Sequence, residues 1–136
     1  MIHRARRIGR WTAVFLFATK RYDIEGVLAC LYDFGASRKV MREAEDFMLQ
    51  GRFNQGFTFS NPKEHCAVVL IGPTTSGAEF LNTLAHEIDH LSAQIAYNRG
   101  KSLRGEAPAY IAGDSTRALA EIICELGCDH CRPEKV

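Results

Sequence analysis

The sequence has almost no net charge and no apolar run long enough to cross a membrane. Seventeen Lys and Arg side chains are offset by sixteen Asp and Glu side chains, which leaves a formal net charge of +1 over 136 residues. This balance provides no general attraction for nucleic acid or for an anionic lipid surface. The apolar segment WTAVFLFAT at 11–19 is far shorter than the roughly 20 residues of a transmembrane helix. We therefore expect neither a membrane nor a nucleic acid as a partner.

A complete export signal is also missing. The basic run HRARRIGR at 3–10 and the apolar segment after it imitate a secretory leader, but the chain continues into KRYD without a small-x-small cleavage pattern. We expect a buried β-strand at 11–18 instead. Residues 1–10 are predicted to form a basic, potentially flexible arm. Such an arm is either a solvated terminus or a contact with phosphate or with an acidic protein in an assembly.

Cysteine is too sparse and too irregular for a disulfide framework. The chain has five cysteines, an odd number, so we expect mostly free thiols and a reducing, cytoplasmic compartment. Cys124, Cys128, His130 and Cys131 lie close together in the sequence. They could hold a zinc ion as a single knuckle, but no distant pair of ligands accompanies them, so a second metal site stays open.

Repeats, low-complexity segments and linkers are absent, and the length fits one domain over 1–136. Apolar periodicity and turn residues predict an α+β fold in which a small sheet has two helices before its hairpin and two after it. The hairpin turns at Asn61-Pro62-Lys63. The predicted helices cover 24–35, 38–50, 78–98 and 106–127, and the predicted strands include 11–18 and 67–71. Ser37 and Ser76 are predicted caps of the second and third helices.

The string HEIDH at 86–90 is the main chemical signal of the chain. On a helix, His86 and His90 are one turn apart on one face, so both imidazoles can reach one metal ion. Glu87 projects from the adjacent stripe, where a carboxylate can take a proton from a metal-bound water without being a ligand itself. The sequence therefore predicts a zinc site with Glu87 as the catalytic base.

A strand, a helix with H-E-x-x-H and a second helix with an acidic residue resemble the core of the zincin metallopeptidases. The metzincin clan would need Gly at position 93 and His at position 96, where this chain has Ala93 and Ala96. The segment GEAPAYIAGD resembles the Glu-bearing helix of small, single-domain gluzincin-like proteins of bacteria and phages. The resemblance covers about 66–127 and implies that His86, His90 and Glu106 hold the zinc ion.

The third ligand is not unique in the sequence. A tight antiparallel hairpin centred near Ser102 would place Asp114 level with His90, so Asp114 is the rival to Glu106. The carboxylate that is not a ligand could accept a hydrogen bond from a ligand histidine and fix its tautomer. Tyr110, four residues after Glu106, is either a catalytic hydroxyl that stabilises an oxyanion or an aromatic packed between helices.

These features predict a zinc-dependent metallopeptidase whose substrate is a peptide or protein. Glu87 would take the proton of the water that attacks the peptide bond and pass it to the leaving amine. Extended substrate would add to an edge of the sheet, for which NQGFTF at 54–59 is the candidate strand. The alternative is a metal-binding protein with a zincin fold that acts as a structural or assembly component, for instance of a phage particle. In that case it would be associated with the virion.

Overall fold

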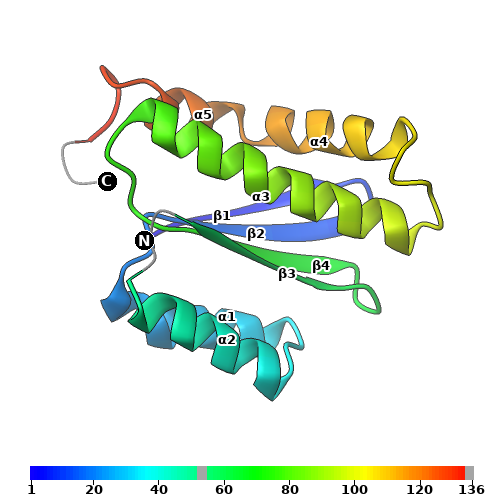
Figure 1. Ribbon diagram of the computed structural model, residues 1–136, viewed down its shortest axis with the longest axis horizontal. Helices are drawn as coiled ribbons and strands as arrows, with labels where there is room; N and C mark the ends of the chain where they lie inside the picture. Colours follow the sequence, from blue (N-terminus) through cyan, green and yellow to red (C-terminus); the bar gives the residue numbers. More distant parts are fainter. Residues whose placement is uncertain (52–54, 134–136) are drawn as a thin grey trace.

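The computed structural model describes residues 1–51 and 55–133 and consists of three layers. A four-stranded sheet forms the middle layer of this described part. Two helices, α1 and α2, cover one face of the sheet, and the helices α3, α4 and α5 cover the other face (Figure 1). The α+β class predicted from the sequence is therefore confirmed.

Along the described residues, the elements follow one another in blocks: two strands, two helices, two more strands and three helices. The strands are β1 (Ile2–Ile8), β2 (Trp11–Phe17), β3 (Gly56–Asn61) and β4 (Cys66–Ile71). The helices are α1 (Ile24–Asp33), α2 (Arg38–Leu49), α3 (Gly77–Asn98), α4 (Ala107–Ala118) and α5 (Ala120–Gly127), and a short 3₁₀ turn, η1, covers Arg21–Asp23. The predicted strand at 11–18 is confirmed as β2, and the predicted hairpin at 61–63 joins β3 to β4.

The sheet has the order β1-β2-β4-β3 and is mixed. Strand β2 pairs with β1 in the antiparallel sense and with β4 in the parallel sense, and β3 pairs with β4 in the antiparallel sense. The central strands β2 and β4 are almost wholly apolar, as expected for strands covered on both faces. Strand β3 lies at one edge of the sheet, next to the helix that carries HEIDH.

Two hydrophobic cores lie on the two faces of the sheet. Alternate residues of β2 point to opposite faces: Phe15 and Phe17 enter the core under α3, whereas Val14 and Leu16 enter the core under α1 and α2. The helix α3 buries Leu84, Ile88, Leu91 and Ile95 in the first core. This buried stripe determines which side of α3 faces the sheet.

Local helix signals are largely confirmed. The Ser37 hydroxyl accepts a hydrogen bond from the Val40 backbone N–H at 3.2 Å, and the Ser76 hydroxyl accepts one from the Glu79 N–H at 3.1 Å. The Glu79 carboxylate accepts hydrogen bonds from the Thr75 hydroxyl and backbone N–H, and these bonds lower its pKa. Both caps therefore stand where the sequence predicted them.

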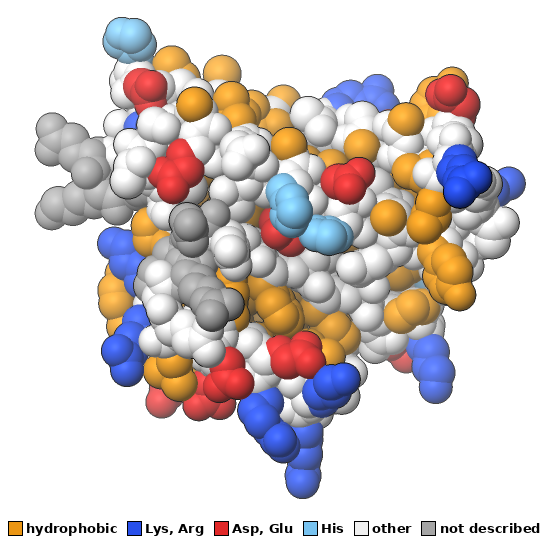
Figure 2. All heavy atoms as spheres, viewed as in Figure 1, with side chains coloured by type: hydrophobic (Ala, Val, Ile, Leu, Met, Phe, Trp, Pro, Cys, Tyr) orange, Lys and Arg blue, Asp and Glu red, His pale blue; other side chains and the backbone are white. Residues whose placement is uncertain are grey.

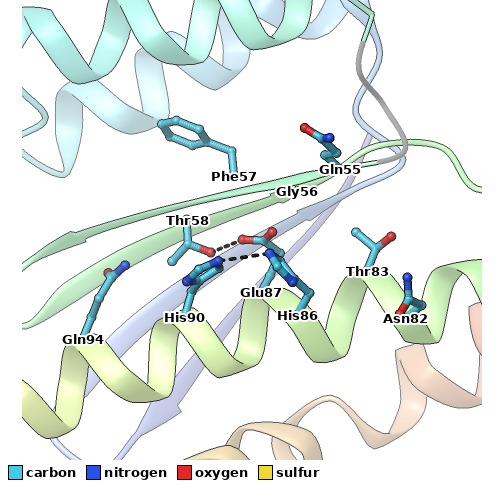
Figure 3. Close-up of a pocket in the computed structure, with 10 residues that line it drawn as sticks. All are labelled: Gln55, Gly56, Phe57, Thr58, Asn82, Thr83, His86, Glu87, His90 and Gln94. Carbon is cyan, nitrogen blue, oxygen red and sulfur yellow. Dashed lines mark hydrogen bonds between the residues drawn. The ribbon is translucent and has the colours of Figure 1, made fainter. Parts of the chain in front are cut away.

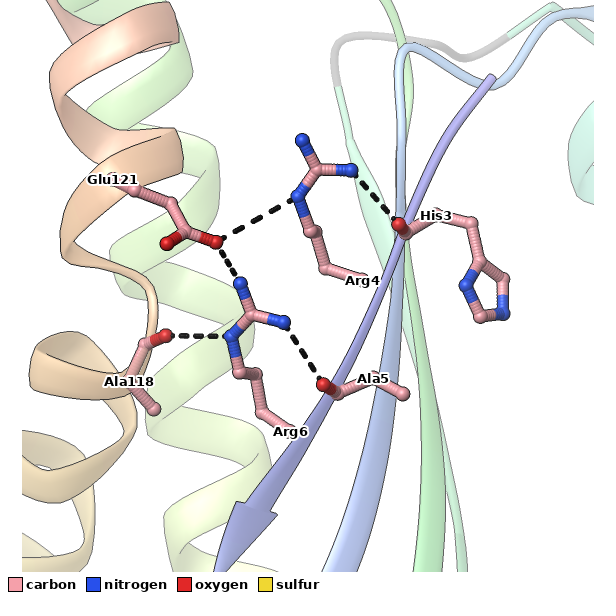
Figure 4. A network of polar contacts seen from close by, with 6 residues as sticks. All are labelled: His3, Arg4, Ala5, Arg6, Ala118 and Glu121. Atoms are coloured by element: carbon pink, nitrogen blue, oxygen red, sulfur yellow. Dashed lines mark hydrogen bonds and ion pairs between the residues drawn. The ribbon is translucent and has the colours of Figure 1, made fainter.

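The predicted basic arm is a strand of the sheet. Residues 2–8 form β1, an edge strand paired along its length with β2. On one side of this strand, the Arg6 guanidinium donates through Nε to the carbonyl oxygen of Ala118 at 2.8 Å. Arg4 and Arg6 also pair with Glu121 of α5 (Figure 4). The prediction of a flexible arm is wrong, because distant partners in the α4–α5 region bind these arginines.

The long C-terminal helix predicted at 106–127 is in fact two helices. The break is at Leu119, which has φ −107° and ψ 12° and is completely buried. The neighbouring Ala118 carbonyl is the group that accepts the Arg6 hydrogen bond. A continuous helix was the wrong prediction, because the burial of Leu119 and the Arg6 contact both depend on segments far away in the sequence.

No helix within the two described ranges is long and apolar enough to span a membrane. The longest helix, α3, has 22 residues, but it carries polar and charged side chains along its exposed faces.

The Arg6 contacts predict a measurable contribution to stability. Replacing Arg6 with Ala removes a charged donor from a half-buried carbonyl, so we expect the free energy of unfolding to fall by about 1–2 kcal/mol. Arg7→Ala is the matched control, because Arg7 points to the exposed side of the same strand. Urea denaturation of the two variants measures the difference, and equal midpoints would contradict a role for the Arg6 contacts.

Candidate metal centre

The HEIDH motif lies in the middle of α3, on the side of that helix that faces β3 (Figure 3). His86, Glu87 and His90 all point from α3 toward this edge strand. Their direction follows from the helical repeat, because Ile88 and Leu91 occupy the stripe that packs on the sheet. The two histidines therefore remain exposed while Glu87, nearer to the core, is buried.

The two imidazoles are close enough to share one metal ion. Their Nε2 atoms lie 3.0 Å apart, and the rings meet edge to face with centroids 4.6 Å apart. Bonds of about 2.0–2.1 Å from nitrogen to zinc require the two nitrogens to be within about 4.2 Å of each other. The pair satisfies this requirement, so the donor set fits two of the ligands of a zinc or similar transition-metal ion.

Glu87 is a buried carboxylate beside this pair. It is only 3% exposed, and its Oε2 accepts a hydrogen bond from the Thr58 hydroxyl of β3 at 2.6 Å. Gly56 provides the space, because a Cβ at that position would overlap the Glu87 side chain. Burial of a carboxylate costs free energy unless partners compensate for the lost water. The β3 strand supplies one such partner and leaves the carboxylate at the wall of a cavity.

The cavity between β3 and α3 has a volume of about 660 Å³. Its walls carry uncharged polar side chains in addition to the HEIDH residues. The residues that line the cavity are Gln55, Gly56, Phe57, Thr58, Asn82, Thr83, His86, Glu87, His90 and Gln94. Figure 2 shows two histidine side chains next to each other near the middle of this face, open to solvent. A ligand can therefore reach the imidazoles directly.

Sequence analysis missed two polar residues of the cavity. Thr58 holds the Glu87 carboxylate, and nothing in the local sequence of β3 marks it. The Oε1 atom of Gln94 is buried and has no hydrogen-bond partner among the described residues. An unpaired buried acceptor is costly and calls for an explanation. Its position could have been found, because His86, His90 and Gln94 follow one another at intervals of four on one helix face.

The structure does not bring the predicted third ligands to the two histidines. Helix α4 runs along the flank of α3 away from β3 (Figure 1), and its buried stripe includes Ile111 and Ser115. Glu106, Tyr110 and Asp114 share another stripe, as their spacing implies, and all three are exposed. Asp114 pairs with Arg117 of its own helix at 2.7 Å.

The described residues contain no group of three or more His, Cys, Asp or Glu side chains placed to hold one ion. This finding applies equally to the HEIDH site and to the cysteines at 124–131. The structure thus gathers His86, His90 and Glu87, whereas a third ligand from α4 and a second metal site stay predictions.

No family model, curated protein or solved structure matches this chain. The function of the site must therefore be inferred from the chemistry of its own residues.

The paired imidazoles predict that metal binding depends on both histidines. Loss of a residue that only hydrogen-bonds to a metal ligand typically lowers metal affinity by about 10–100-fold. Loss of a ligand itself should cost more, so His86→Ala or His90→Ala should weaken zinc binding by more than about 100-fold. Titration against a chromophoric chelator measures the affinity. Asp89→Ala is the control, because Asp89 is exposed on the same helix. Equal affinities for His90→Ala and Asp89→Ala would contradict the site.

The same titration tests the third ligand. Glu106→Ala should weaken zinc binding if α4 approaches the histidines when the metal is bound, and Asp114→Ala should then have a smaller effect. A loss confined to Asp114→Ala would instead assign the ligand to Asp114. Both side chains are exposed, so neither change should disturb the core.

Proposed function

We propose that the protein is a zinc-dependent metallopeptidase in which Glu87 is the general base. The observation that carries this proposal is the buried Glu87 carboxylate, which lies in the same cavity as the imidazole pair and is held by Thr58. A site that only binds metal for stability has no need of a carboxylate beside its ligands. A hydrolytic site needs one to take a proton from the attacking water.

His86 and His90 would hold the metal, with a third ligand from α4 as the sequence predicts. The zinc ion supplies a polarised water whose pKa is about 7 and an electrophile for the carbonyl group. Imidazole nitrogen is a ligand type that suits zinc, so His86 and His90 would hold the ion without cancelling its positive charge.

Glu87 would move the proton in this mechanism. The Thr58 hydroxyl donates to Oε2 and so fixes the orientation of the carboxylate toward the cavity. The neighbouring Gly56 leaves its backbone close to the carboxylate without a side chain in between. Glu87 would accept the proton of the water and then donate it to the leaving amine.

A peptide substrate suits the shape of this site. Strand β3 is hydrogen-bonded to β4 along one side and lies at the edge of the described sheet. An extended peptide can add to such an edge through main-chain hydrogen bonds, and residues 55–58 of this edge line the cavity. The unpaired Gln94 Oε1 is an acceptor for an N–H group of a bound peptide. Asn54, the first residue of the predicted substrate strand, lies outside the described residues.

Replacing Glu87 with Gln tests the base. The variant should retain zinc affinity and lose peptide hydrolysis by about 10²–10⁴-fold, because general-base catalysis typically contributes that much. A quenched fluorescent peptide library measures cleavage, and Asp89→Asn provides the control on the exposed face of the same helix. Full activity in Glu87→Gln would rule out this mechanism.

Gly56→Ala tests whether the position of Glu87 matters. The added Cβ would overlap the Glu87 side chain and displace the carboxylate. We expect kcat/KM to fall roughly 10²-fold, the effect of a misplacement of about 1 Å, with zinc affinity unchanged. Gly113→Ala on α4 is the matched control, because no atom lies within 4 Å of a Cβ there. Equal activity of the two variants would show that Gly56 does not position the base.

A second candidate is a metal-binding assembly component without peptidase activity. The observation in its favour is that the His86 and His90 Nε2 atoms lie 3.0 Å apart, whereas the described residues place no third ligand beside them to complete a hydrolytic centre. The basic segment no longer supports this candidate through a free arm, because it forms β1 of the sheet. Zinc binding by a wild-type protein that cleaves no member of the peptide library would favour this second function.

A further inference from the structure

A pair of cysteines lies in a tight turn at the end of α5, away from the HEIDH cavity. Helix α5 ends at Gly127, and the chain then turns through Cys128-Asp129-His130-Cys131. The backbone N–H of Cys131 donates to the Cys128 carbonyl at 3.0 Å. A turn with this hydrogen bond brings its first and fourth Cα atoms within about 7 Å. Disulfides span Cα distances of about 4.4–6.8 Å, so the two residues are placed for a bridge.

The turn is held in place by contacts to the beginning of α3. Asp129, between the two cysteines, accepts a hydrogen bond from the Gly77 backbone N–H at 2.7 Å. The backbone at Gly127 also packs closely on Gly77. A Cβ added at Gly77 would overlap the carbonyl oxygen of Gly127. Arg132 donates to the Leu126 carbonyl at 2.8 Å and to Thr74. These contacts hold the backbone of the turn, and with it the backbone positions of the two cysteines.

The two thiols of the turn differ in acidity. Hydrogen bonds from the backbone N–H groups of His130 and Cys131 lower the pKa of Cys128. Cys131 has a raised pKa, because its thiol donates to Cys128 and the Cys128 charge opposes a second one. The bridge itself does not depend on which of the two thiols reacts first, because one cysteine attacks and the other resolves the mixed disulfide.

The other cysteines are less suited to this chemistry. Burial raises the pKa of both Cys30 and Cys66, which keeps them protonated and slow to react. Cys124 is exposed on α5, one helical turn before Cys128. Cys131 is exposed and Cys128 is half-buried, so a small reagent can reach the pair.

We propose that Cys128 and Cys131 form a reversible thiol–disulfide redox site whose reaction partner is a small-molecule disulfide. The thiolate of one of the two cysteines attacks one sulfur of the partner RSSR, which forms a mixed disulfide and releases one RS⁻. The other cysteine then loses its proton to solvent and attacks the cysteine sulfur of the mixed disulfide. The Cys128–Cys131 bond forms, and the second RS⁻ leaves. The dithiol is oxidised by two electrons, and RSSR is reduced to two thiols.

The test uses oxidised glutathione and the full chain. Reduced Cys124→Ala protein is incubated with oxidised glutathione in the presence of a chelator, and its free thiols are then blocked by alkylation. Mass spectrometry of the peptide containing 128 and 131 should show the loss of two hydrogen atoms, and dithiothreitol should reverse it. Cys124→Ala is chosen because it leaves only this pair in the peptide, and Cys124 is exposed.

Two further variants test whether each cysteine resolves the adduct of the other. Cys131→Ser in the Cys124→Ala background should accumulate a glutathione adduct on Cys128, because the resolving thiol is gone. Cys128→Ser in the same background should accumulate its adduct on Cys131 for the same reason. Both changes are on the exterior turn, and circular dichroism confirms that each variant is folded.

Three results would overturn the proposal. The first is the absence of an intramolecular bridge in Cys124→Ala protein. The second is a glutathione adduct that persists on Cys124→Ala protein without being resolved to the bridge. The third concerns zinc. If purified His86→Ala/His90→Ala protein still contains a zinc ion, and if adding Cys128→Ser removes that ion, the cysteines are a metal site. None of these results depends on whether the HEIDH site hydrolyses peptides.

Discussion

The contact between α3 and the edge strand β3 is the constraint on which the candidate site depends. Ile88 and Leu91 hold α3 on the sheet, and this orientation directs Glu87 toward β3. The Thr58 hydroxyl and the space above Gly56 accommodate the carboxylate there. Without this strand the carboxylate would either be solvated or be buried without a partner, and the second state is strongly unfavourable. The edge strand thus positions the Glu87 carboxylate and at the same time borders the cavity of the candidate site.

The opposite flank of α3 is organised by the N-terminal strand. Arg6 of β1 binds the Ala118 carbonyl, and Arg4 and Arg6 pair with Glu121. These contacts hold the α4–α5 segment against the edge of the sheet that is remote from β3. Helix α4, which carries Asp114 and follows Glu106, lies on this flank, and both residues are exposed to solvent. For α4 to supply the third ligand of a zinc site, this helix would have to move toward the histidines when the metal binds. Such a movement would have to keep or break the contacts of α4 and α5 with β1.

Much of the fold could be predicted from local sequence signals. The caps at Ser37 and Ser76 involve hydrogen bonds three residues away, so the residues that make them are adjacent in the sequence. The close approach of the His86 and His90 rings likewise follows from their spacing on one helix. The errors concern long-range contacts. Residues 2–8 form a strand because β2 offers a pairing edge, and the helix break at Leu119 coincides with the Arg6 contact. Neither partner is visible in a local pattern.

The sequence by itself determined the helix, the paired histidines and the adjacent glutamate, because a helical repeat translates spacing directly into a shared face. The tertiary structure alone decided what surrounds them. It placed Thr58 beside Glu87, left the Gln94 oxygen without a hydrogen-bond partner among the described residues, and put helix α4 on the flank of α3 away from β3. It also joined the Cys128–Cys131 turn to the start of α3 through Asp129. These placements depend on how separate elements pack, and packing is set by the whole buried surface rather than by the residues of the site.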